Sequence, residues 1–264
     1  MILKCPVHTE TGGKMEFIKI DRENDIAVIT LCKGKVHEIS EPAVDQIHNA
    51  FKEFEKDHNI RGILLTGEGK FFSFGLDIPG FLEYRKAMFA RFLSKFTNLY
   101  RYLFTYPKPI LAALNGHTIA GGCMIANACD YRMMVSGNAR ISLNEITFGS
   151  TVFAGATAML KYLIGGRNAE KMFLTGKMFT AEEALELGLV DRVVEVDSLM
   201  TEAMKELKDM AKHDLTAYAH VKKLLRAPVV RLMESREEMS IAEFNDIWYS
   251  EGTWDKLKEI KIKE

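Results

Sequence analysis

Residues Lys108 to Cys129 read KPILAALNGHTIAGGCMIANAC, and the order of elements in this segment is the clearest indication of the fold. From Pro109 onward, 21 residues pass without an Asp, Glu, Lys or Arg, which is long enough for a membrane helix. Its glycines and asparagines, however, would interrupt such a helix and leave polar groups without partners in lipid. We therefore predict a buried strand at 110–114, a glycine loop, and a buried helix that begins near Gly122.

The same order of elements, strand, glycine loop and helix, also occurs before this stretch. Before it, a buried strand is predicted at 62–66, followed by a glycine loop over 67–80 and a helix over about 81–106 that ends before Pro107. The other predicted elements are a hairpin of 17–21 with 26–31, a helix capped by Ser40, and strands at 131–135 and 139–142. Alternating strands and helices predict an α/β fold with parallel strands and with ligand loops at their carboxyl ends.

The C-terminal part of the chain is predicted to be helical. Beyond Ala154, the pair Thr180 and Glu183 forms a capping box, and from Ser198 onward amphipathic helices carry aromatic residues such as Phe244 and Trp248 on one face. These helices either fold back on the α/β body or pack on another subunit. We divide the chain into an N-terminal tail at 1–14, an α/β domain at 15–197 and a helical region at 198–264.

The composition excludes several classes of protein. Of the 264 residues, 35 are Lys or Arg and 36 are Asp or Glu, so no basic excess points to a nucleic-acid partner. A hydrophobic content of 47% excludes a disordered chain. The N-terminal residues show no signal-peptide pattern, so no secretion is expected. The four cysteines form no C-x-x-C pair, which favours the reducing cytoplasm and speaks against a zinc or other metal site. No membrane partner is expected.

Two glycine loops are the candidates for chemistry, because the chain has neither a complete phosphate loop nor a G-x-S-x-G elbow. One spans 71–78 and the other spans 115–123. Each follows a buried strand and enters a helix, so each can present unpaired backbone N–H groups to an anion. The alternative is that the glycines only permit tight turns and close packing.

Several motifs together resemble the crotonase superfamily of enoyl-CoA hydratases and isomerases. They are FGLDI at 74–78, the KPILAALNG and AGGC segments running into CDYR, LNEI from Leu143, and AEEALELGLVDRVV at 181–194. The resemblance extends from about Met15 to the C-terminal EGTWDKLK. It implies a crotonase-like spiral of ββα units and a C-terminal helical region that forms a homotrimer or a dimer of trimers.

The resemblance also implies an acyl-CoA substrate whose thioester oxygen lies between two backbone N–H groups. By position, these donors fall on Leu76 and Gly121. Fixed donors of this kind stabilise the negative charge of a thioester enolate, typically by ~3–4 kcal/mol each. Coenzyme A would enter as part of the substrate, and no separate cofactor is implied.

The positions at which this chain departs from the family pattern indicate which of the family's reactions it catalyses. Where hydratases of the family carry one catalytic glutamate, this chain has Met124, while the second family glutamate is present as Glu145. Water addition calls for two carboxylates, whereas moving a double bond from a 3-enoyl to a 2-enoyl thioester needs one. We therefore expect an isomerase with Glu145 as its base. The alternatives are that Glu145 caps a helix or pairs with Arg140, and that Met124 is a plain core residue.

Further substrate-binding positions follow from the resemblance. They are Lys35, Val36, Phe74, Gly75, Asp77, Ile78, Gly122, Met124 and Phe153. Phe153 stands where many hydratases have glycine, which again disfavours hydration. The terminal cluster of Lys256, Lys258, Lys261 and Lys263 either meets a ribose phosphate or is a solvated tail. Other open readings are a hydratase, a decarboxylase, a thioesterase, and a non-catalytic or RNA-binding scaffold.

Overall fold

A six-stranded sheet forms the larger layer of the computed structural model, which describes residues 16–260. Its order is β1-β2-β3-β5-β7-β9, and every pair is parallel except the N-terminal hairpin of β1 with β2. The strands are β1 (Ile18–Glu23), β2 (Ile26–Leu31), β3 (Gly62–Gly67), β5 (Ile110–Leu114), β7 (Tyr131–Val135) and β9 (Arg192–Val194). The predicted hairpin and parallel strands are confirmed.

A second, three-stranded parallel sheet consists of β4 (Phe71–Ser73), β6 (His117–Ile119) and β8 (Ile141–Ser142), in that order. It takes two of its strands, β4 and β6, from segments predicted to be loops. From β3 onward, the first strand of each pair joins the large sheet and the second joins the small one, whereas β1 and β2 both belong to the large sheet. This arrangement is the crotonase-like spiral, and β4 and β6 escaped prediction because each has only three residues.

The helices follow the strands as predicted, with one correction. They are α1 (Glu41–Lys56), α2 (Ile78–Phe81), α3 (Lys86–Phe104), α4 (Gly121–Ala128), η1 (Glu145–Phe148), α5 (Ala154–Thr175), α6 (Ala181–Glu186), η2 (Val196–Ser198), α7 (Leu199–Ala211), α8 (Leu215–Trp248) and α9 (Glu251–Glu259). The single helix predicted over 81–106 is wrong: it is divided into α2 and α3. Asp77 caps the short α2 by accepting a hydrogen bond from the Gly80 N–H, and α2 therefore begins at Ile78, before the predicted start at residue 81.

Two predicted helix caps have different outcomes. The Thr180 and Glu183 capping box is present at the start of α6. Ser40 does precede α1, but its side chain makes no capping hydrogen bond, and its hydroxyl is buried without a partner among the described residues. The helix is instead held by its apolar face, which buries Val44, Ile47 and Phe51.

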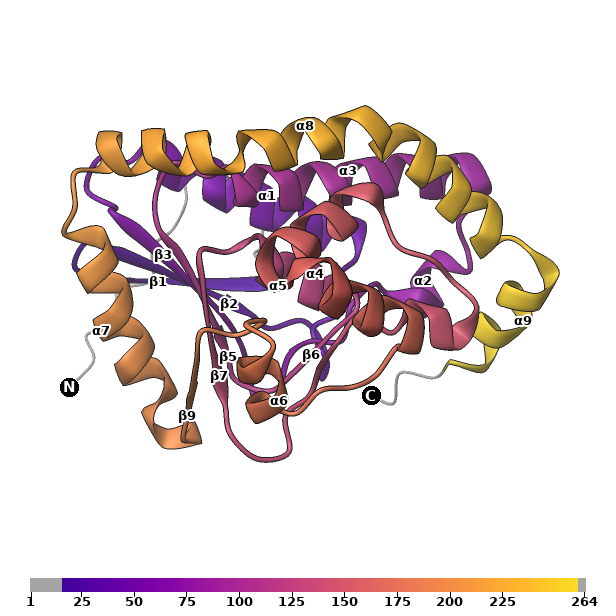
Figure 1. Ribbon diagram of the computed structural model, residues 1–264, viewed down its shortest axis with the longest axis horizontal. Coiled ribbons are helices and arrows are strands. Elements are labelled where there is room, and N and C mark those ends of the chain that lie inside the picture. The colour runs from indigo at the N-terminus through magenta and orange to yellow at the C-terminus, as the bar shows by residue number, and fades with distance from the viewer. Residues whose placement is uncertain (1–15, 261–264) are drawn as a thin grey trace.

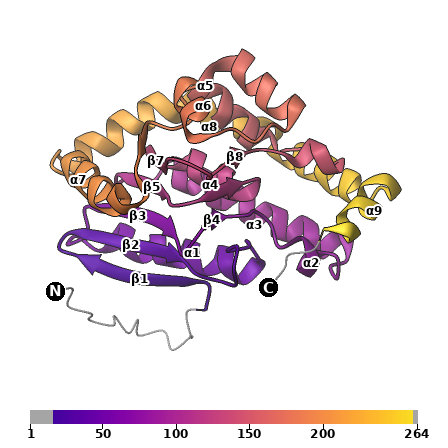
Figure 2. The ribbon, with the colours of Figure 1, turned by 90° about the horizontal axis from the view of Figure 1, so that it is seen from below.

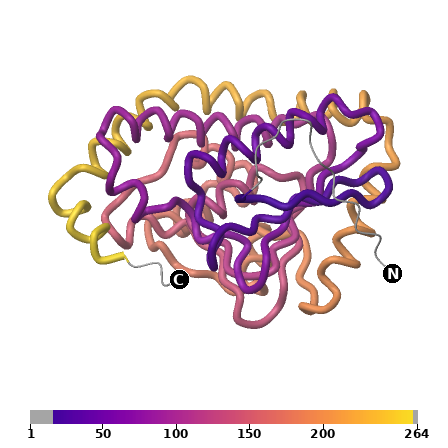
Figure 3. The backbone as a smooth tube through the Cα atoms, turned by 180° about the vertical axis from the view of Figure 1, so that it is seen from behind, coloured from indigo at the N-terminus to yellow at the C-terminus, as the bar shows by residue number. Residues whose placement is uncertain are grey.

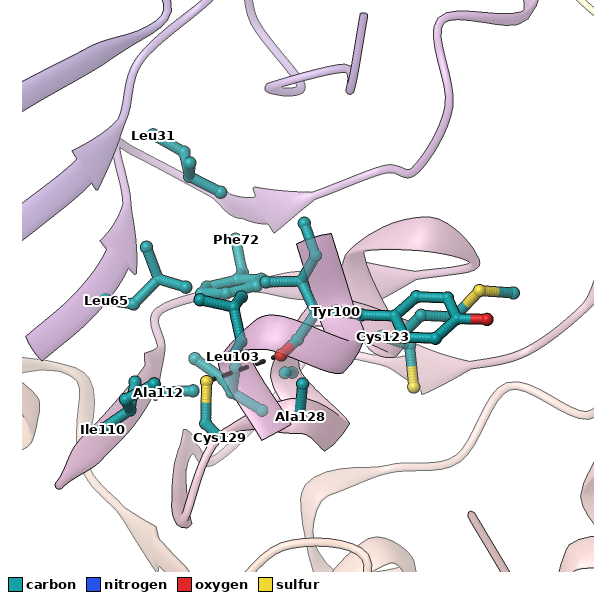
Figure 4. Packing of buried hydrophobic residues seen from close by; sticks show 14 of the residues in the cluster. Leu31, Leu65, Phe72, Tyr100, Leu103, Ile110, Ala112, Cys123, Ala128 and Cys129 are labelled. Carbon is teal, nitrogen blue, oxygen red and sulfur yellow. Dashed lines mark hydrogen bonds between the residues drawn. The ribbon is translucent and has the colours of Figure 1, made fainter. Parts of the chain in front are cut away.

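The core lies between the large sheet and helices α3 and α4. Figure 4 shows this packing around Phe72 and Leu103, with Leu65 and Ile110 of the large sheet beside them. The described cysteines are free, and burial raises the pKa of Cys123 and Cys129, so both behave as inert core residues. Within residues 16–260, no helix has the length and apolar character needed to cross a membrane.

The C-terminal helices fold back on the body of the same chain. Helix α8 is about 50 Å long. It runs along one side of the molecule beside α3 and packs on both α3 and α5 (Figures 1 and 3). Helix α7 packs on β3, β5 and β7 of the large sheet. Figure 2 shows β1 and β2 on the opposite side of the molecule from α5 and α6. This packing brings the far end of α8 over the ends of the small sheet.

Candidate active site

The carboxyl ends of the small sheet bring together the three residues expected to act on substrate. Since β4, β6 and β8 are parallel neighbours, the segments that follow them leave from the same edge. Leu76 follows β4, Gly121 follows β6 and Glu145 follows β8. All three line one cavity.

The segment from Gly75 to Asp77 is held by its pairing with Ile39. The Ile39 N–H donates to the Gly75 carbonyl at 2.8 Å, and the Asp77 N–H donates to the Ile39 carbonyl at 3.2 Å. Because backbone groups alternate in direction along an extended segment, the Leu76 N–H points away from Ile39. It has no acceptor among the hydrogen bonds of the described residues.

The second donor lies at the N-terminus of α4. Gly121 is the first residue of this helix, where backbone N–H groups have no intrahelical partner, and its N–H has no acceptor within residues 16–260. The preceding Ala120 adopts a φ of 49°, which is uncommon for a residue with a side chain. Its N–H donates to the Ser142 carbonyl at 2.8 Å, so the strained turn is tied to β8.

The two donor loops touch one another. Gly75 has a φ of 98°, and a Cβ atom at this position would lie 3.1 Å from the Gly121 nitrogen. A Cβ atom at Gly121 would in turn lie 3.2 Å from Cδ2 of Leu76. Glycine at both positions therefore permits the close approach of two unpaired N–H groups, as an oxyanion site requires.

The cavity has a volume of about 180 Å³ and an apolar lining. Of the predicted site residues, Leu76, Gly121, Glu145, Phe74, Ile78, Met124 and Phe153 line it. Sequence reasoning missed the rest of the lining, namely Phe96, Ile119, Ala120, Asn144, Phe148, Phe244, Trp248 and Ile260. The spacing of Phe244 and Trp248 marked an apolar helix face, but only the fold shows that this face covers the cavity.

Glu145 is the one charged residue of this lining within the described chain. It exposes 4% of its surface, and its Oε2 atom has no hydrogen-bond partner among the described residues. Burial raises the pKa of its carboxyl to about 8, opposed only by a backbone hydrogen bond. Arg140 binds the carbonyls of Gly137 and Ala139 and makes no ion pair with Glu145, so that alternative is wrong.

No second carboxylate lines the cavity within residues 16–260. Met124 lies one turn into α4, is 2% exposed and contributes an apolar wall. Phe153 precedes α5 and stacks on Phe244, with ring centroids 4.5 Å apart. The position that carries a glutamate in family hydratases is therefore filled by a thioether in an apolar surrounding.

The other predicted site residues do not line the cavity. Gly75 and Asp77 shape the first donor loop, and Gly122 packs against Ser73 so closely that a Cβ atom would lie 2.7 Å from it. Val36 is buried and accepts a hydrogen bond from the Phe74 N–H at 2.9 Å, whereas Lys35 is exposed.

The predicted basic cluster is only partly described. Lys258 pairs with Asp255 at 2.7 Å, and Lys256 lies beside Gly149 at the end of η1. Lys261 and Lys263, like the tail at 1–14, lie outside the described residues. The cluster's contact with a ribose phosphate remains a prediction.

Comparisons with known proteins identify the family of this chain. Residues 21–252 match the family model described as enoyl-CoA hydratase/isomerase. The chain is 29% identical over 248 residues to the mitochondrial enoyl-CoA hydratase of Pongo abelii, covering 91% of this chain and 81% of the relative. It is 33% identical over 186 residues to the short-chain-enoyl-CoA hydratase of Clostridium acetobutylicum, covering 70% and 71% respectively.

Solved structures show the same fold. The human mitochondrial delta3-delta2-enoyl-CoA isomerase superposes with a TM-score of 0.88 at 23% identity, covering 92% of this chain and 96% of that one. An enoyl-CoA hydratase from Bacillus halodurans superposes with a TM-score of 0.84 at 25% identity, covering 92% and 100%. Proteins named for either reaction thus share this architecture, and the choice between the reactions has to come from the side chains.

Proposed function

The chain belongs to the enoyl-CoA hydratase/isomerase family, and from this premise we propose that it is an isomerase, which moves the double bond of a 3-enoyl-CoA to the 2-trans position. The observation that carries the proposal is the buried carboxylate of Glu145, the one charged side chain among the described residues that line the cavity. The same cavity is lined by Leu76 and Gly121, whose backbone N–H groups have no acceptor within residues 16–260.

In the proposed reaction, Glu145 removes a proton from C2 of the thioester. The electrons released form a dienolate, whose negative charge collects on the thioester oxygen beside the N–H groups of Leu76 and Gly121. Fixed donors stabilise that charge without having to reorganise. The protonated Glu145 then returns the proton to C4, so the double bond lies between C2 and C3 and the enzyme is regenerated.

The apolar surroundings suit this role of Glu145. A carboxylate of ordinary pKa is a weak base, and burial strengthens it by destabilising the charged form. The same surroundings disfavour hydration, because Met124 supplies neither a proton acceptor nor a hydrogen bond to position water. Both features support an isomerase over a hydratase.

The first prediction concerns Glu145→Gln, which keeps the shape of the side chain but removes the base. We expect kcat for a 3-enoyl-CoA to fall by about 10²- to 10⁴-fold, the usual contribution of a general base. The measurement is the ultraviolet absorbance of the conjugated 2-enoyl thioester as it forms. A variant that isomerises as fast as the parent would show that another group is the base.

Two controls separate the proposal from its alternatives. Circular dichroism of Glu145→Gln should match the parent, which shows that the fold is retained. Mass spectrometry after incubation with 2-enoyl-CoA and malonyl-type CoA esters should show no gain of water, no loss of carbon dioxide and no free CoA. Each of those products would instead identify a hydratase, a decarboxylase or a thioesterase.

Two further proposals concern assembly and location. From the family resemblance we propose that the chain assembles as a homotrimer or a dimer of trimers, and from its cysteine usage we propose that it works in the cytoplasm. Exposed apolar side chains on α8, among them Leu224 and Leu225, supply surface for such an assembly.

A further inference from the structure

The inner end of the cavity is closed by aromatic side chains. Exposure tells the two ends apart: Phe74 at one end is 40% exposed, whereas Phe96, Phe153, Phe244 and Trp248 are at most 2% exposed. We infer that the mouth lies on the side of Phe74 and that the four buried rings, which pack on one another, close the other side. We call these four residues the aromatic wall.

The rings of the aromatic wall pack directly on one another. The Phe153 and Phe244 rings stack at 4.5 Å with an interplanar angle of 22°, and the Phe244 and Trp248 rings follow at 5.9 Å and 23°. Phe96 meets the edge of Phe153 at 6.3 Å. An acyl chain longer than the cavity would have to separate these contacts to extend further.

Side chains of α8 accept hydrogen bonds that hold the start of α5 beside the aromatic wall. Phe153 precedes α5, whose first N–H groups lack a cap of their own. The Ala154 N–H donates to Ser240 Oγ at 3.0 Å, and the Gly155 N–H donates to Glu237 Oε2 at 2.6 Å. The Tyr100 hydroxyl donates to the same carboxylate, which joins α3, α5 and α8 behind the wall. A shift of the backbone at Phe153 would break these bonds.

The volume in front of the aromatic wall is small. An apolar cavity of about 150 Å³ holds one benzene molecule, which has six carbon atoms. The cavity here has about 180 Å³ and must also hold the thioester carbonyl beside Leu76 and Gly121. The space left for the acyl tail is therefore that of a short chain.

We propose that the aromatic wall limits this enzyme to short acyl groups of about six carbons or fewer, with Phe153 as the residue that sets the limit. This inference rests on the proposed acyl-CoA chemistry and names its substrate class. Because each buried methylene improves binding, affinity should rise with chain length until the tail meets the wall and then fall.

The test measures binding and turnover separately. Calorimetry with butanoyl-, hexanoyl-, octanoyl- and decanoyl-CoA should show the tightest binding at butanoyl or hexanoyl, and at least a tenfold loss at decanoyl. Turnover of 3-enoyl-CoA esters of the same lengths should follow the same order. Phe153→Ala should bind decanoyl-CoA at least tenfold more tightly than the parent does.

Two control variants accompany this test: a smaller change at Phe153 itself, and the removal of a phenylalanine ring that does not line the cavity. Phe153→Leu removes less of the wall and should give an intermediate limit, even if the alanine variant folds poorly. Phe173→Ala removes a partly buried ring from α5, the helix that follows Phe153, at a position that does not line the cavity, and should leave the length preference unchanged.

The outcomes distinguish this inference from the proposed function. Short-chain binding without isomerisation would overturn the proposed reaction and support the length limit. Isomerisation with equal or tighter binding of decanoyl-CoA, unchanged by Phe153→Ala, would overturn the length limit alone. Failure to bind any acyl-CoA would overturn both.

Discussion

At the scale of the residue, the chemistry depends on where Glu145 is placed. Its carboxyl is buried among apolar side chains with one oxygen unpartnered within the described chain, and burial raises its pKa to about 8. A buried carboxylate without an ion pair is costly for folding and useful for proton abstraction. Burial of this carboxyl therefore lowers the stability of the fold and makes Glu145 a stronger base.

The pH dependence of catalysis follows from this pKa. Glu145 acts as a base only when it is ionised, so kcat/KM should rise about tenfold per pH unit below its pKa and level off above about 8. A pH–rate profile with a 3-enoyl-CoA substrate measures this directly. A flat profile between pH 6 and 9 would mean that the proton acceptor titrates elsewhere.

The stability of the fold supplies a control for the same group. The pKa of this carboxyl is higher in the folded protein, at about 8, than its unfolded value of 4.5. Its contribution to the free energy of unfolding is therefore fully present below pH 4.5 and is lost as the pH rises through about 8. The glutamine of Glu145→Gln does not titrate, so the variant keeps its stability while the parent loses stability between these pH values. The free energy of unfolding of the variant should therefore rise relative to that of the parent by roughly 3–5 kcal/mol. Urea unfolding at several pH values tests it.

At the scale of the element, the small sheet builds the site. The three strands are too short to be stable alone, yet their parallel order places three loops at one edge. Gly116 makes the crossing between the sheets possible, because a Cβ atom there would lie 1.9 Å from the Lys70 carbonyl oxygen. Asn115 secures this crossing by accepting the Gly67 N–H at 2.9 Å.

A pair of glycine variants tests the donor geometry. Gly75→Ala places a Cβ atom 3.1 Å from the Gly121 nitrogen at a φ of 98°, so the donor loops must separate, and we expect kcat to fall about 100-fold. Gly69→Ala is the matched control, since its φ of 69° is also strained but no atom lies within 4 Å of the new Cβ. Steady-state kinetics should show near-normal turnover for this control. Equal losses in both variants would point to general destabilisation.

At the scale of the whole molecule, α8 joins distant parts of the chain. Near its start, Lys222 and Arg226 meet the buried Asp130 at 2.7 Å and 3.0 Å, and Asp130 also accepts the Ile110 N–H at 2.8 Å. Farther along, its aromatic residues close the cavity. The helix is therefore anchored to the large sheet at one end and completes the site at the other.

Removal of the buried anion should weaken this anchor. Asp130→Asn leaves two buried cations without their shared partner, and we expect the free energy of unfolding to fall by about 3–5 kcal/mol. Thermal unfolding measures this loss, and Asp255→Asn, which removes an exposed partner of Lys258, should change little. If both variants unfold at the parent's temperature, the buried triad does not hold α8.

The sequence by itself determined the family, the alternation of strands and helices, and the identity of Glu145, Leu76 and Gly121 as candidates, because these depend on local pattern and on residue type. The tertiary structure decided how these residues meet. Strands as short as β4 and β6 have too few residues to show a periodic pattern and form only through pairing. The aromatic wall depends on a contact between residues such as Phe96 and Phe244, far apart in the chain. Burial of Glu145, which raises its pKa, likewise exists only once α4, η1 and α8 are packed around it.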